Sequence, residues 1–348
     1  MLMIGPDCSA TSAAMPQATE PNTIAERRHL MFGFYRPLAC GTASASTTQI
    51  MAFALHNRKH LDAELTKVVR RELRKASRAL RNATGIPIET LIHESRKSVK
   101  KVRAAASLLE QSGAKLPRKD RKRLKATGRA LSKCRDSAAI VETLDRVHRR
   151  YPKRLADSTY GILRRALVDA RNRQSAQATQ GIATEAADAL RRTRKSAKAW
   201  TRDSIAFSDM VKAIGDSYRR SRNAMQRARA TGHSAPLHRW RKELKTLWYQ
   251  LRLARPFTTG AAPLIAALKR LETELGDDHD LVVLGATLRG CRELRSMPAA
   301  LRQVERLGLR MRQQLRRRAF SLGRRAQART PRGFTRWLRS ATMKQGRR

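Results

Sequence analysis

A helical spacing of apolar residues runs almost without a break from about residue 58 to residue 330, and it predicts an all-α fold. Leu, Ala, Arg and Lys dominate this stretch, and apolar positions recur at steps of three and four residues. No segment shows the two-residue alternation of a strand. Turn-forming residues divide the stretch into helical lengths at 85–87, 113–117, Pro152, 232–236, 256–263 and Pro298.

The helical stretch also contains an internal repeat. The pattern His-x-x-Arg-Lys-x-x-Lys begins at His93 and again at His238, with apolar residues matching behind it. Two further pairs match in the same order, namely 131–136 with 275–280 and 69–71 with 218–220. Three segments recurring in one order indicate duplication of a helical unit. We therefore predict two related helical units.

The repeat sets the predicted domain boundaries. The two copies should meet near residues 175–205, where the polar and weakly patterned stretch 173–188 is the best linker candidate. Residues 1–50 are rich in Ser, Thr, Ala, Pro and Met, and indicate either a disordered extension or sequence upstream of a true start at Met51. The predicted regions are an extension (1–57), a domain (58–330) with copies at about 58–175 and 205–330, and a basic frayed tail (331–348).

The charge balance points to a polyanionic partner. The chain has 348 residues, with 75 Lys and Arg against 28 Asp and Glu, giving a net charge of +47. Self-repulsion on this scale costs stability, which argues against a monomer with a small neutral substrate. The apolar fraction of 41% is enough for a core, whereas 5% aromatic residues argues against a β-sandwich and against base stacking as the main binding mode.

Each copy of the repeated pattern forms a basic stripe on a helix. His93, Arg96, Lys97 and Lys100 stand at i, i+3, i+4 and i+7, which places them on one face. An apolar face lies beside this stripe and should dock the helix onto a core. The apolar residues of this first helix are Ile92, Val99, Val102, Ala106 and Leu109.

The second copy repeats this arrangement. Its stripe consists of His238, Arg241, Lys242 and Lys245, and its apolar face of Leu237, Leu244, Leu247 and Leu251. Like charges stacked at these spacings are mildly destabilising, and we expect no carboxylate to be interleaved on this face. A single charge run is usually only a solvated face, but two matched copies in a chain of this charge favour a ligand.

The ligand that suits these stripes is an extended row of anions. Arg offers a planar fork to phosphate oxygens, and Lys adds a point charge. A histidine beside such cations should lose its proton readily, and a bound phosphate should raise its pKa and let it donate. His93 and His238 are therefore candidates for phosphate contact, and a packing or capping role for either stays open.

These repeated segments resemble the CHAD family, the conserved histidine α-helical domain. The resemblance rests on the two His-x-x-Arg-Lys-x-x-Lys segments and on the segments around Arg135-Asp136 and His279-Asp280, and covers roughly residues 58–330. It implies two helical bundles about a pseudo-two-fold axis, with a basic groove between them. It also implies binding of inorganic polyphosphate and association with polyphosphate granules.

The resemblance carries over residue by residue to the two stripes. It adds weaker candidates on the preceding helices, namely Arg70, Arg74, Arg219 and Arg222. The chain departs from the family in its extension and in Ser132, which stands where the second copy has Gly276. Some family members carry a triphosphate-hydrolase barrel ahead of the domain, and no strand-rich segment supports one here.

The acidic run at residues 277–280 has its own interpretation. Gly276 resembles a helix C-terminal cap, so Asp280 should cap a helix beginning at Leu281, and Asp136 should do the same in the first copy. Capping, or pairing with Arg, is favoured over metal-dependent hydrolysis, because the further His and Asp ligands cannot be assembled. We expect no enzyme activity, no metal and no cofactor.

The main alternative function is non-specific binding of RNA or DNA, since any such surface attracts nucleic acid at low salt. No helix-turn-helix, zinc-finger or RNA-stacking motif is present, and no phosphate-binding Gly-rich loop either. Trp240 and Trp248 flank the second stripe and are predicted to be core. The four cysteines form no CxxC pair, and no apolar run reaches membrane-spanning length, so we expect a cytoplasmic protein.

Overall fold

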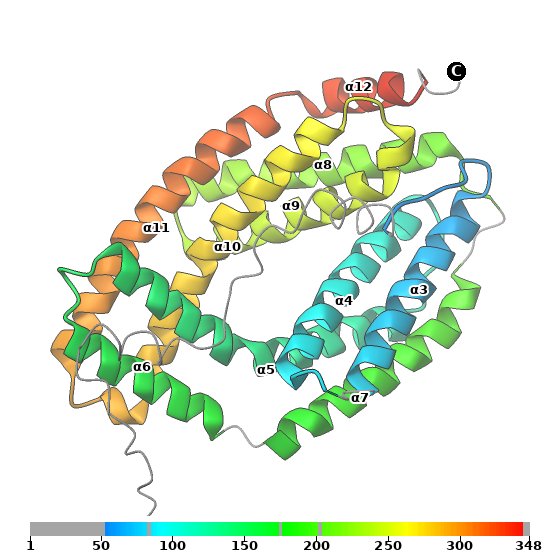
Figure 1. Ribbon diagram of the computed structural model, residues 1–348. Coiled ribbons are helices and arrows are strands. Elements are labelled where there is room, and N and C mark those ends of the chain that lie inside the picture. The colour runs from blue at the N-terminus through cyan, green and yellow to red at the C-terminus, as the bar shows by residue number, and fades with distance from the viewer. Residues whose placement is uncertain (1–52, 82–84, 174–175, 201–203, 344–348) are drawn as a thin grey trace, which may run out of the picture. The chain divides into compact units, whose positions relative to one another are not determined.

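The computed structural model describes residues 53–81, 85–173, 176–200 and 204–343, and every long element in these ranges is a helix (Figure 1). Within them, the side chains at 133, 135–138, 176 and 343 are not described. The predicted all-α fold is therefore confirmed. The long helices are α3 (Leu61–Arg81), α4 (Ile88–Gln111), α5 (Arg118–Arg150), α6 (Asp157–Asn172), α7 (Ala176–Ser196), α8 (Phe207–Thr231), α9 (Ser234–Ala254), α10 (Ala262–Gly290), α11 (Pro298–Ala326) and α12 (Pro331–Met343).

The turn-forming residues mark the helix ends as predicted. Pro87 and Pro117 directly precede α4 and α5, where a missing N–H costs no helical hydrogen bond. Gly113 and Gly232 follow α4 and α8 with φ of 99° and 64°, a left-handed conformation that glycine adopts without strain. These short connections place α3 against α4 and α8 against α9.

The larger hydrophobic core lies among α3, α4, α7, α8, α9 and α12, with parts of α5, α10 and α11. Its largest fully buried side chains include Trp200, Trp240 and Tyr218. The indole of Trp240 donates to the Gln327 side-chain oxygen at 3.3 Å, which satisfies its N–H in the core. The prediction that Trp240 is core is confirmed, and Trp248 packs against the same cluster while partly exposed.

A second, smaller core lies among the C-terminal half of α5, α6, the C-terminal half of α10 and α11. Its members include Leu144, Leu163, Leu284 and Leu307. Both cores combine residues from the two halves of the sequence, and α5, α10 and α11 contribute to each. The helices of one predicted copy thus do not enclose a core of their own, and the duplication itself stays a prediction.

Two segments expected to lack structure are helical. The predicted linker at 173–188 lies largely within α7, which packs on α3 and α5 through Ala183, Ala187 and Leu190. Alanine spacing gives α7 its narrow apolar face, a weaker signal than leucine. Of the predicted frayed tail, residues 331–343 form α12 against α8, with Phe334 stacked on Tyr218 at a ring-centroid distance of 3.9 Å.

The acidic runs lie inside continuous helices rather than at helix ends. Helix α10 passes without a break through Gly276 and Asp280, so the predicted caps at these residues are wrong. Helix α5 likewise continues through Asp136, whose side chain lies outside the described residues. Regular i to i−4 bonding continues because the apolar faces on both sides of each run are buried in the two cores.

The domain begins slightly before the predicted residue 58. Phe53 and Leu55 are fully buried, and the Leu55 backbone N–H donates to the Leu253 carbonyl at 3.1 Å. The rest of the predicted extension, residues 1–52, lies outside the described residues, as do Cys8 and Cys40. Cys134 and Cys291 are buried free thiols. No helix in the described part of the chain is both long enough and apolar enough to span a membrane.

Candidate anion-binding face on α4 and α9

The predicted stripes on α4 and α9 are exposed to the same degree position by position. In each, the histidine, the arginine and the last lysine are partly buried, while the middle lysine, Lys97 or Lys242, is exposed. The apolar faces beside them are buried in the larger core, including Ile92 and Val99 on α4 and Leu244 and Leu251 on α9. Each helix therefore docks and orients its cations as the spacing predicts. The prediction that no carboxylate lies among the cations is wrong on α4, where Lys97 Nζ lies 2.7 Å from a Glu94 carboxylate oxygen.

Helices α4 and α9 pack against each other, which brings the two stripes together. The Gln250 side-chain amide on α9 donates to the Ala104 carbonyl on α4 at 3.3 Å. Lys100 lies close enough to Lys245, Arg96 and Arg241 for their charges to act on it. Burial and then these like charges lower the pKa of Lys100 to about 7.

Glu272 on α10 is the carboxylate at the centre of this cluster. It accepts from Lys245 Nζ at 2.6 Å and Lys269 Nζ at 2.9 Å, and it lies 3.5 Å from an Arg241 guanidinium nitrogen. Burial opposes its ionisation, but the three cations outweigh burial and lower its pKa to about 2. Sequence analysis missed Glu272 because it comes from another helix.

Gly276 lies beside Arg241 where that side chain approaches Glu272. It lies one turn after Glu272 on α10, and a Cβ built on it would be 3.5 Å from an Arg241 guanidinium nitrogen. The Arg241 guanidinium therefore lies over the α10 backbone at a distance that would also accommodate an alanine side chain. Its Nε is buried and has no hydrogen-bond partner within the described residues. The signal in the sequence was Glu and Gly at i and i+4, which share a helix face.

His238 lies at one end of the α9 stripe. Its ring is 4.3 Å from the ring of His279 on α10, centroid to centroid. Burial, then His279, Lys242 and Arg241, lower its pKa to about 4, in the direction predicted for an empty basic site. His93 is partly buried at the matching position on α4.

A second buried carboxylate, Glu72 on α3, lies beside α4. It accepts from the Ser98 hydroxyl at 2.8 Å and from Lys101 Nζ at 3.2 Å. Lys101 also lies 5.1 Å above the Phe53 ring, a cation–π distance. Neither Glu72 nor Lys101 was singled out from the sequence, because one lysine beyond the repeated pattern carries no signal of its own.

The four weaker candidates lie in different surroundings. Arg219 is exposed and pairs with Asp216 at 3.0 Å, and Arg222 donates through Nε to the Gln327 carbonyl at 3.3 Å. Arg70 is partly buried, and its Nε has no hydrogen-bond partner within the described residues. Arg74 is exposed and lines a cavity between α3 and α7, away from the α4 and α9 stripes.

Comparison with known families identifies the family to which this chain belongs. The family model for the CHAD domain matches residues 113–289, just over half of the chain. The chain belongs to the CHAD family. The matched range includes the α9 stripe and the whole of α5, and it begins after the α4 stripe.

A solved structure supports the CHAD fold over a wider range. The crystal structure of the CHAD domain from the plant Ricinus communis is similar to this chain, with a TM-score of 0.63 and 19% sequence identity. The similarity covers 80% of this chain and 95% of the plant chain. At this identity it shows the fold alone. No curated protein matches the chain.

The acidic run of this CHAD domain is held by arginines. Asp278 accepts from Arg312 and Arg316 of α11 at 3.1 and 2.9 Å. Arg146 of α5 pairs with Asp277 and lies 3.7 Å from Asp280. The run thus joins α10 to α5 and α11 at the level where the two cores meet. The described residues contain no group of three His, Cys, Asp or Glu placed to hold a metal ion.

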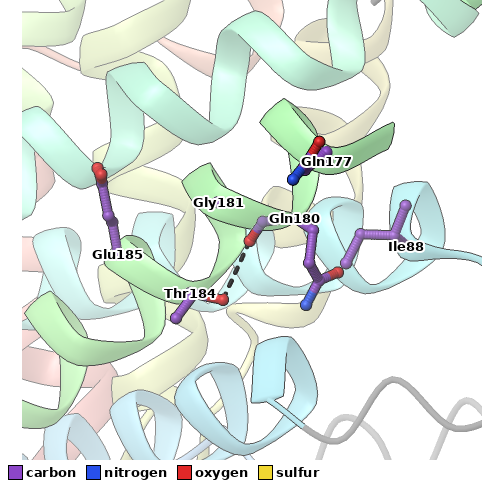
Figure 2. Close-up of a pocket in the computed structure, with 6 residues that line it drawn as sticks. All are labelled: Ile88, Gln177, Gln180, Gly181, Thr184 and Glu185. Carbon is purple, nitrogen blue, oxygen red and sulfur yellow. Dashed lines mark hydrogen bonds between the residues drawn. The ribbon is translucent and has the colours of Figure 1, made fainter. Parts of the chain in front are cut away.

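A hollow between α4 and α7 has a different character from the basic stripes. Figure 2 shows Ile88 from the start of α4 facing Gln177 and Gln180 of α7. The Thr184 hydroxyl donates to the Gln180 carbonyl at 3.1 Å, and Glu185 lies further along the helix. Neutral amides and a carboxylate offer no cation to a phosphate, so this hollow of the CHAD domain is a poor anion site.

Proposed function

We propose that this chain binds long-chain inorganic polyphosphate along the α4 and α9 stripes. The observation that carries the proposal is the convergence of the two matched stripes. The charges of Arg96, Arg241 and Lys245 all lie close enough to Lys100 to lower its pKa. Several cations held together at the cost of mutual repulsion are stabilised by a multivalent anion. Membership of the CHAD family supports the same ligand class.

Arginine and lysine take different parts in this binding. Arg96 and Arg241 supply planar forks for phosphate oxygens, and Lys100 and Lys245 supply point charges between them. Glu272 keeps Lys245 and Arg241 in place before the ligand binds, which reduces the ordering cost of binding. Exposed Lys97 and Lys242 extend the path to solvent.

Binding is accompanied by proton uptake. Lys100 has a pKa of about 7 without ligand, so at neutral pH it is only partly charged. A phosphate nearby raises the pKa of Lys100 and that of His238, whose starting value is about 4. The role proposed is binding without catalysis, with the protein located at polyphosphate granules in the cytoplasm.

Competition between polyanions tests this function. The full chain is loaded with labelled long-chain polyphosphate at about physiological salt and challenged with single-stranded RNA or duplex DNA at equal phosphate concentration. We expect polyphosphate to stay bound against large excesses of both, because the stripes offer charge without base-stacking platforms. Displacement by nucleic acid, phosphate for phosphate, would favour the nucleic-acid alternative instead.

A variant tests the assignment of the face. Replacing Arg96, Lys97, Arg241 and Lys242 together with Ala should abolish tight binding while leaving helicity by circular dichroism unchanged. The matched control removes the same charge from exposed residues elsewhere, namely Lys119, Lys125, Arg227 and Arg229. Equal loss of affinity in the control, or unchanged affinity in the first variant, would show that the face has been wrongly assigned.

A further inference from the structure

An arginine-lined cavity lies between α3 and α7, outside the α4 and α9 stripes. Its volume is about 190 Å³, and helices α3 and α7 pack side by side around it (Figure 1). Five guanidinium groups and one serine line it, with no aromatic side chain and no carboxylate in the lining. The residues are Arg74, Ser77, Arg78 and Arg81 of α3 and Arg191 and Arg194 of α7.

Helix geometry separates this cavity from the site proposed above. At 100° per residue, Arg74, Arg78 and Arg81 lie roughly 180–240° around α3 from Glu72. Glu72 faces α4, where it bonds Ser98 and Lys101. The three arginines therefore lie on the opposite side of α3, and a ligand bound there does not contact the α4 stripe.

The charges around the cavity are only partly balanced. Asp188 of α7 bonds Arg81 and lies 3.8 Å from Arg191. The hydrogen bond from Arg81, then the charges of Arg81, Arg191 and Arg192, lower the pKa of Asp188. Within the described ranges no carboxylate pairs with Arg74, Arg78 or Arg194. Arg74, Arg78 and Arg194 thus have no carboxylate partner in the described part of the chain, while Arg81 and Arg191 share one carboxylate. The cavity therefore carries a net positive charge that can bind an anion.

We propose that this cavity is a second anion site, which binds a compact condensed phosphate such as pyrophosphate or triphosphate. Planar forks from two helices can grip adjacent phosphate groups from both sides. The absence of an aromatic platform in the lining, together with the small volume, favours an inorganic ligand over a nucleotide. This site goes beyond the proposed function and does not depend on the α4 and α9 stripes.

Titration calorimetry with sodium triphosphate at about 0.15 M salt tests the site on the full chain. We expect the double variant Arg78→Gln, Arg194→Gln to lose one binding site, or to weaken it roughly tenfold or more. The variant Arg78→Lys, Arg194→Lys keeps the positive charge but loses the planar guanidinium groups. Its affinity for triphosphate should lie between those of the Gln double variant and the wild type. Circular dichroism checks that each variant is folded.

A charge-matched control is the double variant Arg227→Gln, Arg229→Gln on the exposed surface of α8. It should bind triphosphate as the wild type does. Equal weakening in this control, or unchanged stoichiometry and affinity in Arg78→Gln, Arg194→Gln, would overturn the proposal, because binding would then follow total charge rather than the cavity.

Two further measurements test whether this site is separate from the stripes. They also show whether its phosphate is a free short phosphate or part of a long polyphosphate chain. The four-fold Ala variant of the α4 and α9 stripes should keep the triphosphate site, whether or not it loses long-chain polyphosphate. If Arg78→Gln, Arg194→Gln also weakens long-chain binding, the cavity holds part of the same chain. If only triphosphate binding falls, the cavity takes a free short phosphate. Loss of the triphosphate site in the stripe variant would contradict a separate site.

Discussion

Helices α4 and α9 carry the same four basic residues at the same spacing, but their charges are balanced differently. On α9, Arg241 and Lys245 pair with Glu272. On α4, Lys100 forms no ion pair among the described residues and has a pKa of about 7. The reason lies in the following helices: Glu272 stands three residues before Leu275, and the matching position before Leu131 is Gly128.

The carboxylate of Glu272 therefore acts on cations of both stripes. Gly128 offers no carboxylate to the α4 stripe, so the counter-charge near Lys100 comes from α10. Glu272 also acts on Lys100, whose pKa it raises against the surrounding cations. We therefore expect the α9 stripe to be ordered before polyphosphate binds, and Lys100 of the α4 stripe to become fully charged only on binding.

The largest expected effect comes from removing the shared carboxylate. Glu272→Gln leaves Lys245, Lys269 and Arg241 without their counter-charge, and breaking a buried pair in this way typically costs about 3–5 kcal/mol. We expect a lower free energy of unfolding, recovered in part by polyphosphate. Urea denaturation with and without ligand measures both.

Glu274→Gln is the control for this variant. Glu274 lies on the same helix and pairs at 3.0 Å with Arg318, whose side chain is 60% exposed. An exposed pair of this kind contributes about 0–1 kcal/mol. If Glu272→Gln were no more destabilised than Glu274→Gln, the contrast between the two stripes would not hold.

The next effect is a pH dependence located on α4. In the free protein Lys100 is about half charged at pH 7, gains charge at lower pH and loses it as the pH rises further. A bound phosphate holds the proton, so affinity should fall above pH 7, by at most about tenfold per pH unit. Binding titrations from pH 6 to 9 measure this slope.

Substitution by arginine sharpens the comparison. Lys100→Arg keeps its charge throughout this range and should flatten the slope. Burial lowers the pKa of Lys245 as well, but Glu272 opposes this shift, so Lys245→Arg, the matched change on α9, should alter the slope less. Equal flattening by both variants would mean that the stripes titrate alike.

The smallest effect concerns the helix beneath Arg241. Gly276→Ala places a Cβ at ordinary contact distance, 3.5 Å from the guanidinium. Ala is favoured over Gly within a helix by about 0.5–1 kcal/mol, so thermal unfolding should shift upward slightly while polyphosphate affinity changes little. A marked loss of affinity would show instead that Arg241 needs the open backbone surface to move on binding.

The sequence predicted the fold class and both stripes, because these depend on periodicities within single helices. Arg96 and Lys100 lie on one face by spacing alone, and so do Arg241 and Lys245. It could not predict Glu272, because a counter-charge contributed by another helix depends on packing between elements. The same limit explains α7, whose alanine face gains its stability from α3 and α5.

The predicted caps at Asp136 and Asp280 failed for a related reason. Local preference marks Gly276 and Asp280 as a helix end, but the two cores bury apolar residues on either side of them. Tertiary burial thus outweighs capping preference, and ion pairs with Arg146, Arg312 and Arg316 accommodate the acidic run inside α10.

The sharing of both cores between the two halves has a consequence for synthesis on the ribosome. The smaller core lacks Leu315 until residue 315 has been made, and the larger one lacks Phe334 and Leu338 until residue 338 has been made. At a synthesis rate of about 5–20 residues per second, more than ten seconds pass between the synthesis of the α3 and α4 leucines and that of the last residues that pack in the same core. During that time an incomplete apolar surface is exposed on a chain of high positive charge, and repulsion between such chains opposes their association.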